Sequence, residues 1–454
     1  MKKYKLYDKA LFTVDSSLGR ITLFSLWIPI LFETVMNQLQ GTVNTAVLSG
    51  YSETSVSAVG SVNTVFSVLL LLGTVLATGA TVVVGNLIGG EKIREAGEAS
   101  VSALFFGVAI SLIVTPLLFL ASPAVMRFLQ LEGMLYSEGL LYFRVRVLFY
   151  PFSVLTSTVL ALLKCYGYPR YTFFVSFVIN LLNLLLNLFV IYCPKISPVT
   201  GVLGVALGAG LSTAIGLALA VFLLFRLGIR LRIPSAPSRF WEHLSRVLRI
   251  GIPGGVSGMT FAVVTMLTTA FVPAIGSEAI AAKVYYQNIL CYAYLFSVSI
   301  GNANALLVSR RFGRQEYDLI EKMNRMLVRI TRVINLSVSL LLLLLSRFFV
   351  GIFTESPAII SGAFLVFAVD LIVEQARAES QVYEYALRAT GDVMFTTIFV
   401  VISCFLFGFA LAYFLAIPCG FGLVGLWLGL AADELTRAVV SRIRFHGGKW
   451  RRAL

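Results

Sequence analysis

The sequence predicts an all-α integral membrane protein with twelve transmembrane helices, arranged as two six-helix bundles related by an internal repeat. Three observations carry this prediction. The chain of 454 residues is 58% hydrophobic and only 13% charged, whereas soluble domains carry about 25% charged residues. It contains twelve apolar stretches of about the 20 residues or more that a helix needs to cross a bilayer. Landmarks of its first half also recur in its second half at a nearly constant distance along the chain.

The expected spans are runs of mostly apolar residues. They cover residues 22–48, 56–88, 99–121, 138–163, 169–193 and 201–225 in the first half, and residues 249–273, 279–308, 328–352, 357–387, 393–416 and 421–441 in the second. Pro29 and Pro151 lie within two of these spans, and each removes a backbone hydrogen bond, so we expect a kink at both positions. Residues 1–20 are rich in lysine and lack a cleavage site after a short apolar stretch, which predicts a retained cytoplasmic tail.

The basic residues are distributed very unevenly over the two sides of the expected membrane. With the N-terminus inside, 29 of the 36 lysines and arginines fall on the inner side. Three fall outside, and Arg144, Arg146, Lys283 and Arg377 fall within spans. This asymmetry is the positive-inside pattern, which predicts that both termini lie in the cytoplasm. The short tails are compatible with the plasma (inner) membrane, which is the location that we expect for this multi-pass protein. The asymmetry also accounts for the net charge of +14 without a nucleic-acid partner.

The longest cytoplasmic connection, residues 226–249, follows the sixth span. After Pro234 and Pro237 it carries apolar residues at helical spacing between arginines, namely Phe240, Trp241, Leu244, Val247 and Leu248. Such a pattern is typical of an amphipathic helix that lies on the membrane surface. We therefore expect an N-terminal six-helix lobe over residues 1–225, a linker with an amphipathic helix over 226–249, and a C-terminal six-helix lobe over 250–454.

The two halves resemble each other along their length. Matched landmarks are 224 or 225 residues apart: Pro29 and Pro253, Asn63 and Asn288, Gly89 and Gly313. Each half holds an even number of spans, so both begin on the same side and form parallel repeats. Such repeats are typical of secondary transporters, which bind a small-molecule substrate near the midplane between the halves.

The sequence lacks the residues of most enzymatic sites. It has only two histidines and five scattered cysteines, with no CxxC or HExxH motif, no P-loop and no GxGxxG fingerprint. We therefore expect no enzyme activity, no catalytic residues, no bound metal, no cofactor and no ATP hydrolysis.

Four short motifs, in order, resemble those of the multidrug and toxic compound extrusion (MATE) family. They are Gly41-Thr42-Val43-Asn44-Thr45 in the first span, Gly85-Asn86-Leu87-Ile88-Gly89-Gly90 after the second, Asn183 and Asn187 with Gly201 and Gly204 around the fifth and sixth, and Gly422-Leu423-Val424-Gly425-Leu426-Trp427 in the last. The resemblance covers roughly residues 20–440. It implies a cation-coupled antiporter that takes up Na⁺ or H⁺ and exports bulky, often cationic, organic compounds and xenobiotics by alternating access.

This chain departs from the family pattern at the acids that the resemblance associates with coupling. Family members commonly carry aspartate where this chain has Asn44, and many carry one where it has Asn187. An acid that some members place in the seventh span is missing as well, because the segment from Gly258 to Ala262 is neutral. Amides cannot take up and release a proton near neutral pH, although their carbonyl oxygens can bind Na⁺ weakly. The coupling ion, H⁺ or Na⁺, therefore stays open.

Ionisable residues within a span are costly and usually face a cavity or a partner. The tenth span carries six polar residues at steps of three and four, which place them on one helical face: Asp370, Glu374, Arg377, Gln381, Glu384 and Arg388. The functional interpretation is that Asp370 and Glu374 form a titratable or cation-attracting patch. The structural alternative is that Arg377 pairs with one of the two acids and the stripe only holds helices together.

The first span carries a second polar face, made of Glu33, Asn37, Gln40 and Asn44. We expect it to line the cavity, with Glu33 as the replacement for the missing acids of this lobe. The alternative is hydrogen bonding between helices, which is a common use of amides in membranes.

Three basic residues within spans are compatible with an anionic or zwitterionic substrate, so this alternative to a cationic substrate stays open. Arg144 and Arg146 point to different sides of the fourth span, and we expect one to pair with a buried acid and the other to extend to the interface. Lys283 is expected to reach the interface or to line the mouth of the cavity.

Two other functions compete with that of an exporter. A lipid-linked saccharide flippase of the same broader superfamily is mildly favoured by Arg144 and Arg377, but twelve spans and the Asp370–Glu374 pair argue against it. A membrane-embedded enzyme would need clustered acids with a metal, or a nucleophile with a base, and the spans contain neither. For the exporter we expect a monomer whose partners are the small-molecule substrate and membrane lipid.

Overall fold

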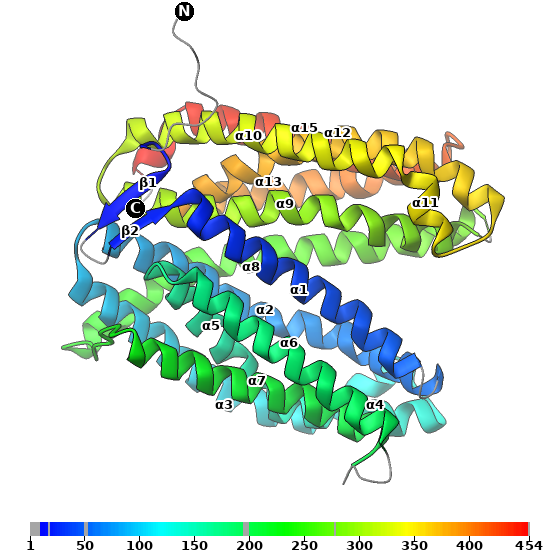
Figure 1. The fold of residues 1–454 in the computed structure, drawn as a ribbon, viewed down its shortest axis with the longest axis horizontal. Helices are drawn as coiled ribbons and strands as arrows, with labels where there is room; N and C mark the ends of the chain where they lie inside the picture. The colour runs from blue at the N-terminus through cyan, green and yellow to red at the C-terminus, as the bar shows by residue number, and fades with distance from the viewer. Residues whose placement is uncertain (1–9, 17–18, 50–52, 194–198, 277, 453–454) are drawn as a thin grey trace, which may run out of the picture. The chain divides into compact units, whose positions relative to one another are not determined.

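The computed structural model describes residues 10–16, 19–49, 53–193, 199–276 and 278–452 (Figure 1). Side chains are described throughout these ranges except at residues 16, 41–49, 53, 54, 56, 57 and 452. The described part is almost entirely helical.

The first half begins with a short hairpin, β1 (Thr13–Ser16) and β2 (Gly19–Thr22), which pair in a two-stranded sheet. Seven helices follow: α1 (Leu23–Ser49), α2 (Glu53–Gly89), α3 (Ile93–Phe128), α4 (Gly133–Leu148), α5 (Tyr150–Cys165), α6 (Pro169–Tyr192) and α7 (Gly201–Arg226). Together, α4 and α5 are long and apolar enough to form one membrane span, which is bent by 48° where the two helices meet. Pro151 lies in the first turn of α5, directly after this break. The kink expected at Pro151 is therefore present.

The second half has the same plan of long helices with local breaks. It consists of α8 (Pro237–Phe271), the 3₁₀ turn η1 (Val272–Ala274), α9 (Ala279–Gly313), α10 (Tyr317–Leu344), α11 (Ser346–Gly351), α12 (Pro357–Ala389), α13 (Val393–Ser403), the π-helical stretch η2 (Cys404–Leu411), α14 (Ala412–Ala416), α15 (Gly422–His446) and the 3₁₀ turn η3 (Lys449–Arg452). Figure 1 shows α10, α12 and α15 side by side, and α12 contacts both of the others.

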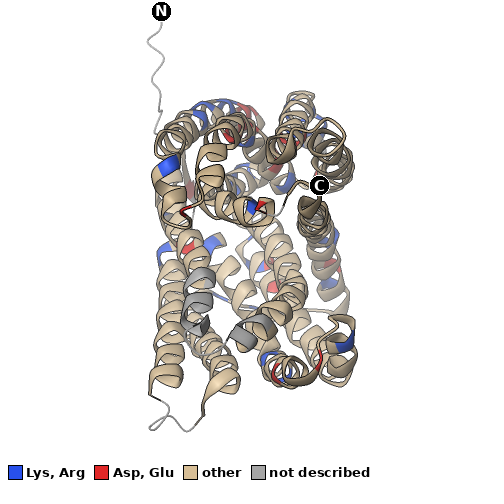
Figure 2. Cartoon of the chain, turned by 90° about the vertical axis from the view of Figure 1, so that its right-hand side faces the viewer, with Lys and Arg blue, Asp and Glu red and all other residues tan. Residues whose placement is uncertain are grey.

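Nine helices of the described part are long and apolar enough to cross a membrane, or ten when α4 and α5 are taken as one span. The remaining expected spans correspond to α1 and α15, and α15 carries Asp433, Glu434 and Arg437 within its length. Figure 2 shows the helices as long uncharged stretches with few basic or acidic positions. Many large apolar side chains on them are exposed, such as Phe105, Leu112 and Leu120, as lipid-facing residues are.

The chain forms two compact units. The C-terminal unit contains the chain up to Asp15, Arg20–Trp27 and Val256 to the end, and the N-terminal unit contains Ser16–Gly19 and Ile28–Gly255. Each has its own apolar core: Val62, Met126 and Phe143 belong to that of the N-terminal unit, and Tyr286, Phe367 and Trp427 to that of the C-terminal unit.

These limits differ from the expected linker over residues 226–249. No separate surface helix is present there, because α8 runs without interruption from Pro237 into the seventh span. Its first half packs tightly within the N-terminal unit. A Cβ atom added at Gly79 of α2 would lie 2.1 Å from the carbonyl oxygen of Val247, and one at Gly251 of α8 would lie 2.1 Å from that of Val75. This close backbone contact places the start of α8 with the N-terminal unit.

The described end of the expected cytoplasmic tail is bound to the C-terminal unit. The buried Arg311 donates hydrogen bonds from Nη2 to the carbonyl oxygens of Leu11 and Thr13, both at 3.0 Å. Phe12 is fully buried, and the indole of Trp27 donates to Ser299 Oγ at 3.0 Å. The first turn of α1 is thereby held on the C-terminal unit, whereas Ile28 and the rest of the helix belong to the N-terminal unit.

Candidate functional site

The polar stripe of α12 is buried in the C-terminal unit. Asp370, Glu374, Gln381 and Glu384 are each at most 5% exposed. They face α15, α9 and α10, the helices that pack most closely on α12. The spacing of the stripe thus directs charged groups into the interior of a helix bundle, where each ionised group needs a partner.

Asp370 is the least compensated acid of this stripe. One of its oxygens accepts a hydrogen bond of 3.3 Å from Nε1 of Trp427, and the other has no hydrogen-bond partner among the described residues. No basic side chain of the described part lies within ion-pair distance of it.

Glu374 lies one turn further along α12 and is fully buried. Its carboxylate accepts hydrogen bonds from Nη1 of Arg377 at 2.6 Å and from Nδ2 of Asn335 in α10 at 3.2 Å. Nδ2 of the same asparagine also lies 2.8 Å from the backbone oxygen of Glu374 and 2.6 Å from Ser297 Oγ of α9. Asn335 of α10 therefore links Glu374 of α12 with Ser297 of α9.

Arg377 connects α12 with α15. Besides Glu374 it contacts Glu434, with Nε 3.1 Å from the carboxylate, and its guanidinium lies over the ring of Tyr294 at 4.6 Å. The structural alternative for Arg377, an ion pair with Glu374, is thus present. Arg377 does not lie within ion-pair distance of Asp370.

Three further members of the cluster come from α15, and the sequence analysis did not select them. Arg437 is fully buried and lies 2.5 Å from Glu434, 3.3 Å from Asp433 and 3.5 Å from Glu384 of α12. The sequence placed Arg437 among the basic residues of the inner side, whereas the structure shows that it pairs with carboxylates of α12 and α15. Two acids followed at steps of three and four by an arginine, inside an apolar helix, is the pattern that would have identified them.

The whole cluster carries more acids than bases. Among the described residues it contains five carboxylates, Asp370, Glu374, Glu384, Asp433 and Glu434, against three arginines, Arg377, Arg388 and Arg437. If all are ionised, the excess is two negative charges inside a membrane-spanning bundle. Such an excess is costly without protons or bound cations. The cluster can therefore take up cations, and Asp370 is its least compensated member.

The described residues contain no set of three histidine, cysteine or carboxylate side chains with the geometry of a metal site. Asp370 and Glu374 offer carboxylate oxygens that suit a proton or one monovalent cation.

In the N-terminal unit, Glu33 is buried but fully paired. Nζ of Lys164, at the end of α5, lies 2.8 Å from Oε1, and Thr172 Oγ1 of α6 donates to Oε2 at 3.0 Å. Lys164 therefore compensates the negative charge of Glu33, the acid that was expected to replace the missing acids of this unit.

The amides of α1 form a ladder with those of α6. Asn180 Nδ2 donates to Asn37 Oδ1 at 3.1 Å, Gln40 Nε2 donates to Asn183 Oδ1 at 3.1 Å, and Asn187 Nδ2 donates to the same oxygen at 3.3 Å. The first two contacts join α1 to α6 and are the hydrogen bonds between helices that the sequence left as the alternative to cavity lining, whereas the third lies within α6. The side chain of Asn44 lies outside the described residues.

The three other basic residues within spans have no carboxylate partner in the described part of the chain. Arg144 donates to Ser122 Oγ at 3.0 Å, and the guanidinium of Arg146 lies over the ring of Phe66 at 4.3 Å. The expectation that one of these arginines pairs with a buried acid is therefore not met. Lys283 is 4% exposed and contacts Thr269 Oγ1 at 2.5 Å, so it does not extend to the interface.

Comparisons with known proteins agree with this architecture. The family model MatE matches residues 29–189 and 253–414, so that the two matched segments start at the paired prolines of the repeat, Pro29 and Pro253. The chain is 31% identical over 430 residues to the "Uncharacterized transporter YisQ" of Bacillus subtilis, covering 94% of both proteins. It is 25% identical over 449 residues to the "Probable multidrug resistance protein NorM" of Thermotoga maritima, covering 99% of this chain and 97% of that protein.

Solved structures show the same fold. An outward-facing multidrug resistance MATE family transporter of the MOP superfamily superposes with a TM-score of 0.87 at 19% identity, covering 94% of this chain and 95% of the other. A MOP superfamily transporter from Pyrococcus furiosus, described as having a binding pocket of reverse polarity, gives a TM-score of 0.85 over the same shares at 19% identity. The predicted all-α membrane fold, with twelve transmembrane helices in two repeated six-helix bundles, is confirmed. The chain is a multi-pass membrane protein and belongs to the MATE family of transporters.

Proposed function

We propose that the protein is a secondary active antiporter that exports bulky organic cations in exchange for H⁺ or Na⁺ by alternating access. The observation that carries this proposal is the excess of buried carboxylates in the C-terminal unit, with Asp370 lacking a basic partner among the described residues. A group of this kind takes up a small cation in one state of the transporter and releases it in another.

The coupling site belongs to the C-terminal unit in this proposal. In the N-terminal unit Asn187 replaces an acid, and Glu33 is neutralised by Lys164 at 2.8 Å. Asp370 takes up H⁺ or Na⁺ from the outer side, and Glu374, held by Arg377 and Asn335, contributes to the local negative potential. The added positive charge weakens the hold on a cationic substrate, which is released outside, and the coupling ion then leaves on the inner side.

The setting is proposed from the charge distribution and the relatives. Both termini lie in the cytoplasm, the membrane is the plasma (inner) membrane, and the transporter works as a monomer that needs no cofactor. Export of several unrelated compounds is supported by the similarity to the Thermotoga maritima relative, which is described as a probable multidrug resistance protein.

A lipid-linked saccharide flippase is the second candidate. Arg144 and Arg146, which lack carboxylate partners among the described residues, favour it because such a substrate carries phosphates. The surplus of carboxylates in the buried cluster of α12 and α15 disfavours it.

The test uses purified protein in liposomes loaded with a fluorescent organic cation. A pH gradient and a Na⁺ gradient are imposed separately, and release is followed in wild type, Asp370→Asn, Glu374→Gln and Glu379→Gln. Glu379 is the matched control, because it lies on α12 but off the stripe and pairs with Arg332 and Arg442. We expect one gradient to drive release in wild type and in the control, and to lose its effect in Asp370→Asn. Release that ignores both gradients, or an unaltered ion dependence in both stripe variants, would refute the proposal.

A further inference from the structure

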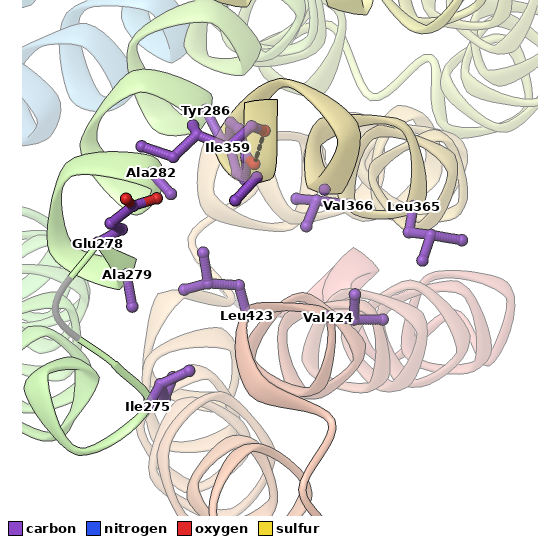
Figure 3. Close-up of a pocket in the computed structure, with 12 residues that line it drawn as sticks. Ile275, Glu278, Ala279, Ala282, Tyr286, Ile359, Leu365, Val366, Leu423 and Val424 are labelled. Atoms are coloured by element: carbon purple, nitrogen blue, oxygen red, sulfur yellow. Dashed lines mark hydrogen bonds between the residues drawn. The ribbon is translucent and has the colours of Figure 1, made fainter. Parts of the chain in front are cut away.

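The C-terminal unit contains a cavity of about 270 Å³ between α9, α12 and α15. Figure 3 shows side chains of the three helices around one open space, including Ala279, Val366 and Leu423. Of the twelve lining residues only Glu278 carries a charge. Its carboxylate is exposed and accepts a hydrogen bond of 2.9 Å from Ser356 Oγ, directly before the start of α12. The cavity is thus apolar, with one acid at its rim.

The cavity lies on the face of α12 that carries Asp370. Ile359, Gly362 and Val366 line it, and the same spacing of three and four residues leads on to Asp370. Val366 and Asp370 are one turn apart, which is about 6 Å along the helix axis. The acid with no basic partner in the described part therefore follows the cavity on the same face of the helix.

Two aromatic side chains connect the cavity with this acid. Tyr286 lines the cavity, and its hydroxyl donates to the carbonyl oxygen of Ile359 at 2.5 Å. Its ring centroid lies 6.3 Å from that of Trp427, whose indole donates to Asp370. A continuous series of contacts thus leads from the wall of the cavity through two rings to the carboxylate.

We propose that this cavity is the route by which the coupling ion, a monovalent cation with its hydration water, reaches Asp370, and that Tyr286 and Trp427 form an apolar constriction on that route. The inference rests on the proposed function and adds the path to it. Apolar constrictions conduct ions only while they are hydrated, so small movements of two rings open or close them. The carboxylate of Glu278 raises the local concentration of cations at the rim. Close to Asp370, Glu374 and Glu434 add negative charge, and Arg377 pairs with both.

The first test fills the cavity. A Cβ atom at Gly362 would lie 3.2 Å from the hydroxyl of Tyr286 and meet nothing else within 4 Å, so Gly362→Leu enters the cavity only if that ring shifts by a few tenths of an ångström. Ser361→Leu is the matched control, because Ser361 is the preceding residue of the same helix and is exposed. We expect Gly362→Leu to slow ion-driven transport by about tenfold at limiting ion concentration, since a blocked constriction stays dry. Equilibrium binding of the fluorescent cation should stay as in wild type, and Ser361→Leu should transport normally.

The second test removes the charge at the rim of the cavity and blocks the cavity chemically at a different position of its wall. Glu278→Gln should raise the ion concentration for half-maximal transport up to about fivefold, the effect of one nearby charge in water, and high salt should abolish the difference. Val366→Cys, in a chain without its five native cysteines, should lose ion-driven transport when a methanethiosulfonate reagent is added after reconstitution. This arm does not depend on the folding of Gly362→Leu.

The outcomes separate the route from the coupling site. Loss of coupling in Asp370→Asn, together with wild-type ion dependence in Gly362→Leu, Glu278→Gln and modified Val366→Cys, would overturn the route alone. It would leave the cavity as a place for lipid chains. Unchanged ion dependence in both Asp370→Asn and Glu374→Gln would overturn the proposed function itself.

Discussion

Arg437 shows how strongly a single residue organises the buried cluster. It is fully buried, it pairs with Asp433, Glu434 and Glu384, and its guanidinium lies over the ring of Phe261 at 4.8 Å. Isolated buried charges are far more costly than paired ones. The arginine thus allows three carboxylates to remain inside the bundle, while Asp370 lies beyond its ion pairs.

Removing this arginine should therefore destabilise the C-terminal unit. We predict that Arg437→Met lowers the free energy of unfolding by about 3–5 kcal/mol, because it leaves buried carboxylates without their partner. Thermal unfolding of purified protein in detergent measures the effect. Arg442→Met is the control, since Arg442 is exposed and lies 3.6 Å from Glu379. Equal losses in both variants would contradict the structural role assigned to Arg437.

The residues of the candidate site differ in how far the sequence could predict them. Helical spacing alone placed Asp370 and Glu374 on one face of the tenth span, because that face interrupts an otherwise apolar helix. The same periodicity grouped Glu33 with Asn37 and Gln40. It could not show that Glu33 is paired with Lys164, because that contact joins residues 131 apart along the chain. Partner choice between helices is decided by packing, which spacing within one helix does not contain.

Among the elements, α8 departs most from the sequence-based expectation. The prolines and arginines of residues 226–249 predicted a surface linker, whereas helix formation continues from Pro237 into the span. The start of α8 approaches α2 so closely that neither Gly79 nor Gly251 has room for a side chain. The composition of residues 226–249 does not reveal this packing, because it depends on two glycines that lie far apart in the sequence, Gly79 of α2 and Gly251 of α8.

This packing gives a prediction within a single helix. Gly79→Ala should destabilise the protein by about 1–3 kcal/mol, because the new methyl group would overlap the carbonyl of Val247. Gly60→Ala, in the same helix and with nothing within 4 Å of the added Cβ, should instead stabilise it by about 0.5–1 kcal/mol. Differential scanning fluorimetry of the two variants checks both signs. A loss of stability in Gly60→Ala, or none in Gly79→Ala, would contradict the α2–α8 contact.

At the scale of the whole molecule, the two repeated bundles have diverged in their chemistry. In the N-terminal unit Glu33 pairs with Lys164, and amides bridge α1 and α6. In the C-terminal unit, the buried cluster of α12 and α15 holds more carboxylates than arginines among the described residues. Duplication and span number could be predicted from the sequence because both depend on hydropathy and on the period of the repeat. This difference in charge could not, because α15 supplies three of the eight charged residues of the cluster and its acids look unremarkable among the basic residues that follow.

The charge distribution of the entire chain predicts its orientation. A green fluorescent protein fused to the C-terminus should be fluorescent in bacterial cells, and alkaline phosphatase at the same position should be inactive, because both termini are expected in the cytoplasm. Fusions in the connection between α3 and α4 should give the opposite pattern. An active phosphatase at the C-terminus would reverse the proposed topology and the side from which the coupling ion enters.

The most direct test of the account is the flux of the coupling ion itself. Proteoliposomes are given an organic-cation gradient, and the movement of H⁺ or Na⁺ in the opposite direction is measured per substrate molecule for wild type, Asp370→Asn and the control Glu379→Gln. We predict a fixed ion-to-substrate ratio in wild type and in the control, and a ratio near zero in Asp370→Asn while substrate still binds. An unchanged ratio in Asp370→Asn would contradict the assignment of the coupling site to the C-terminal unit.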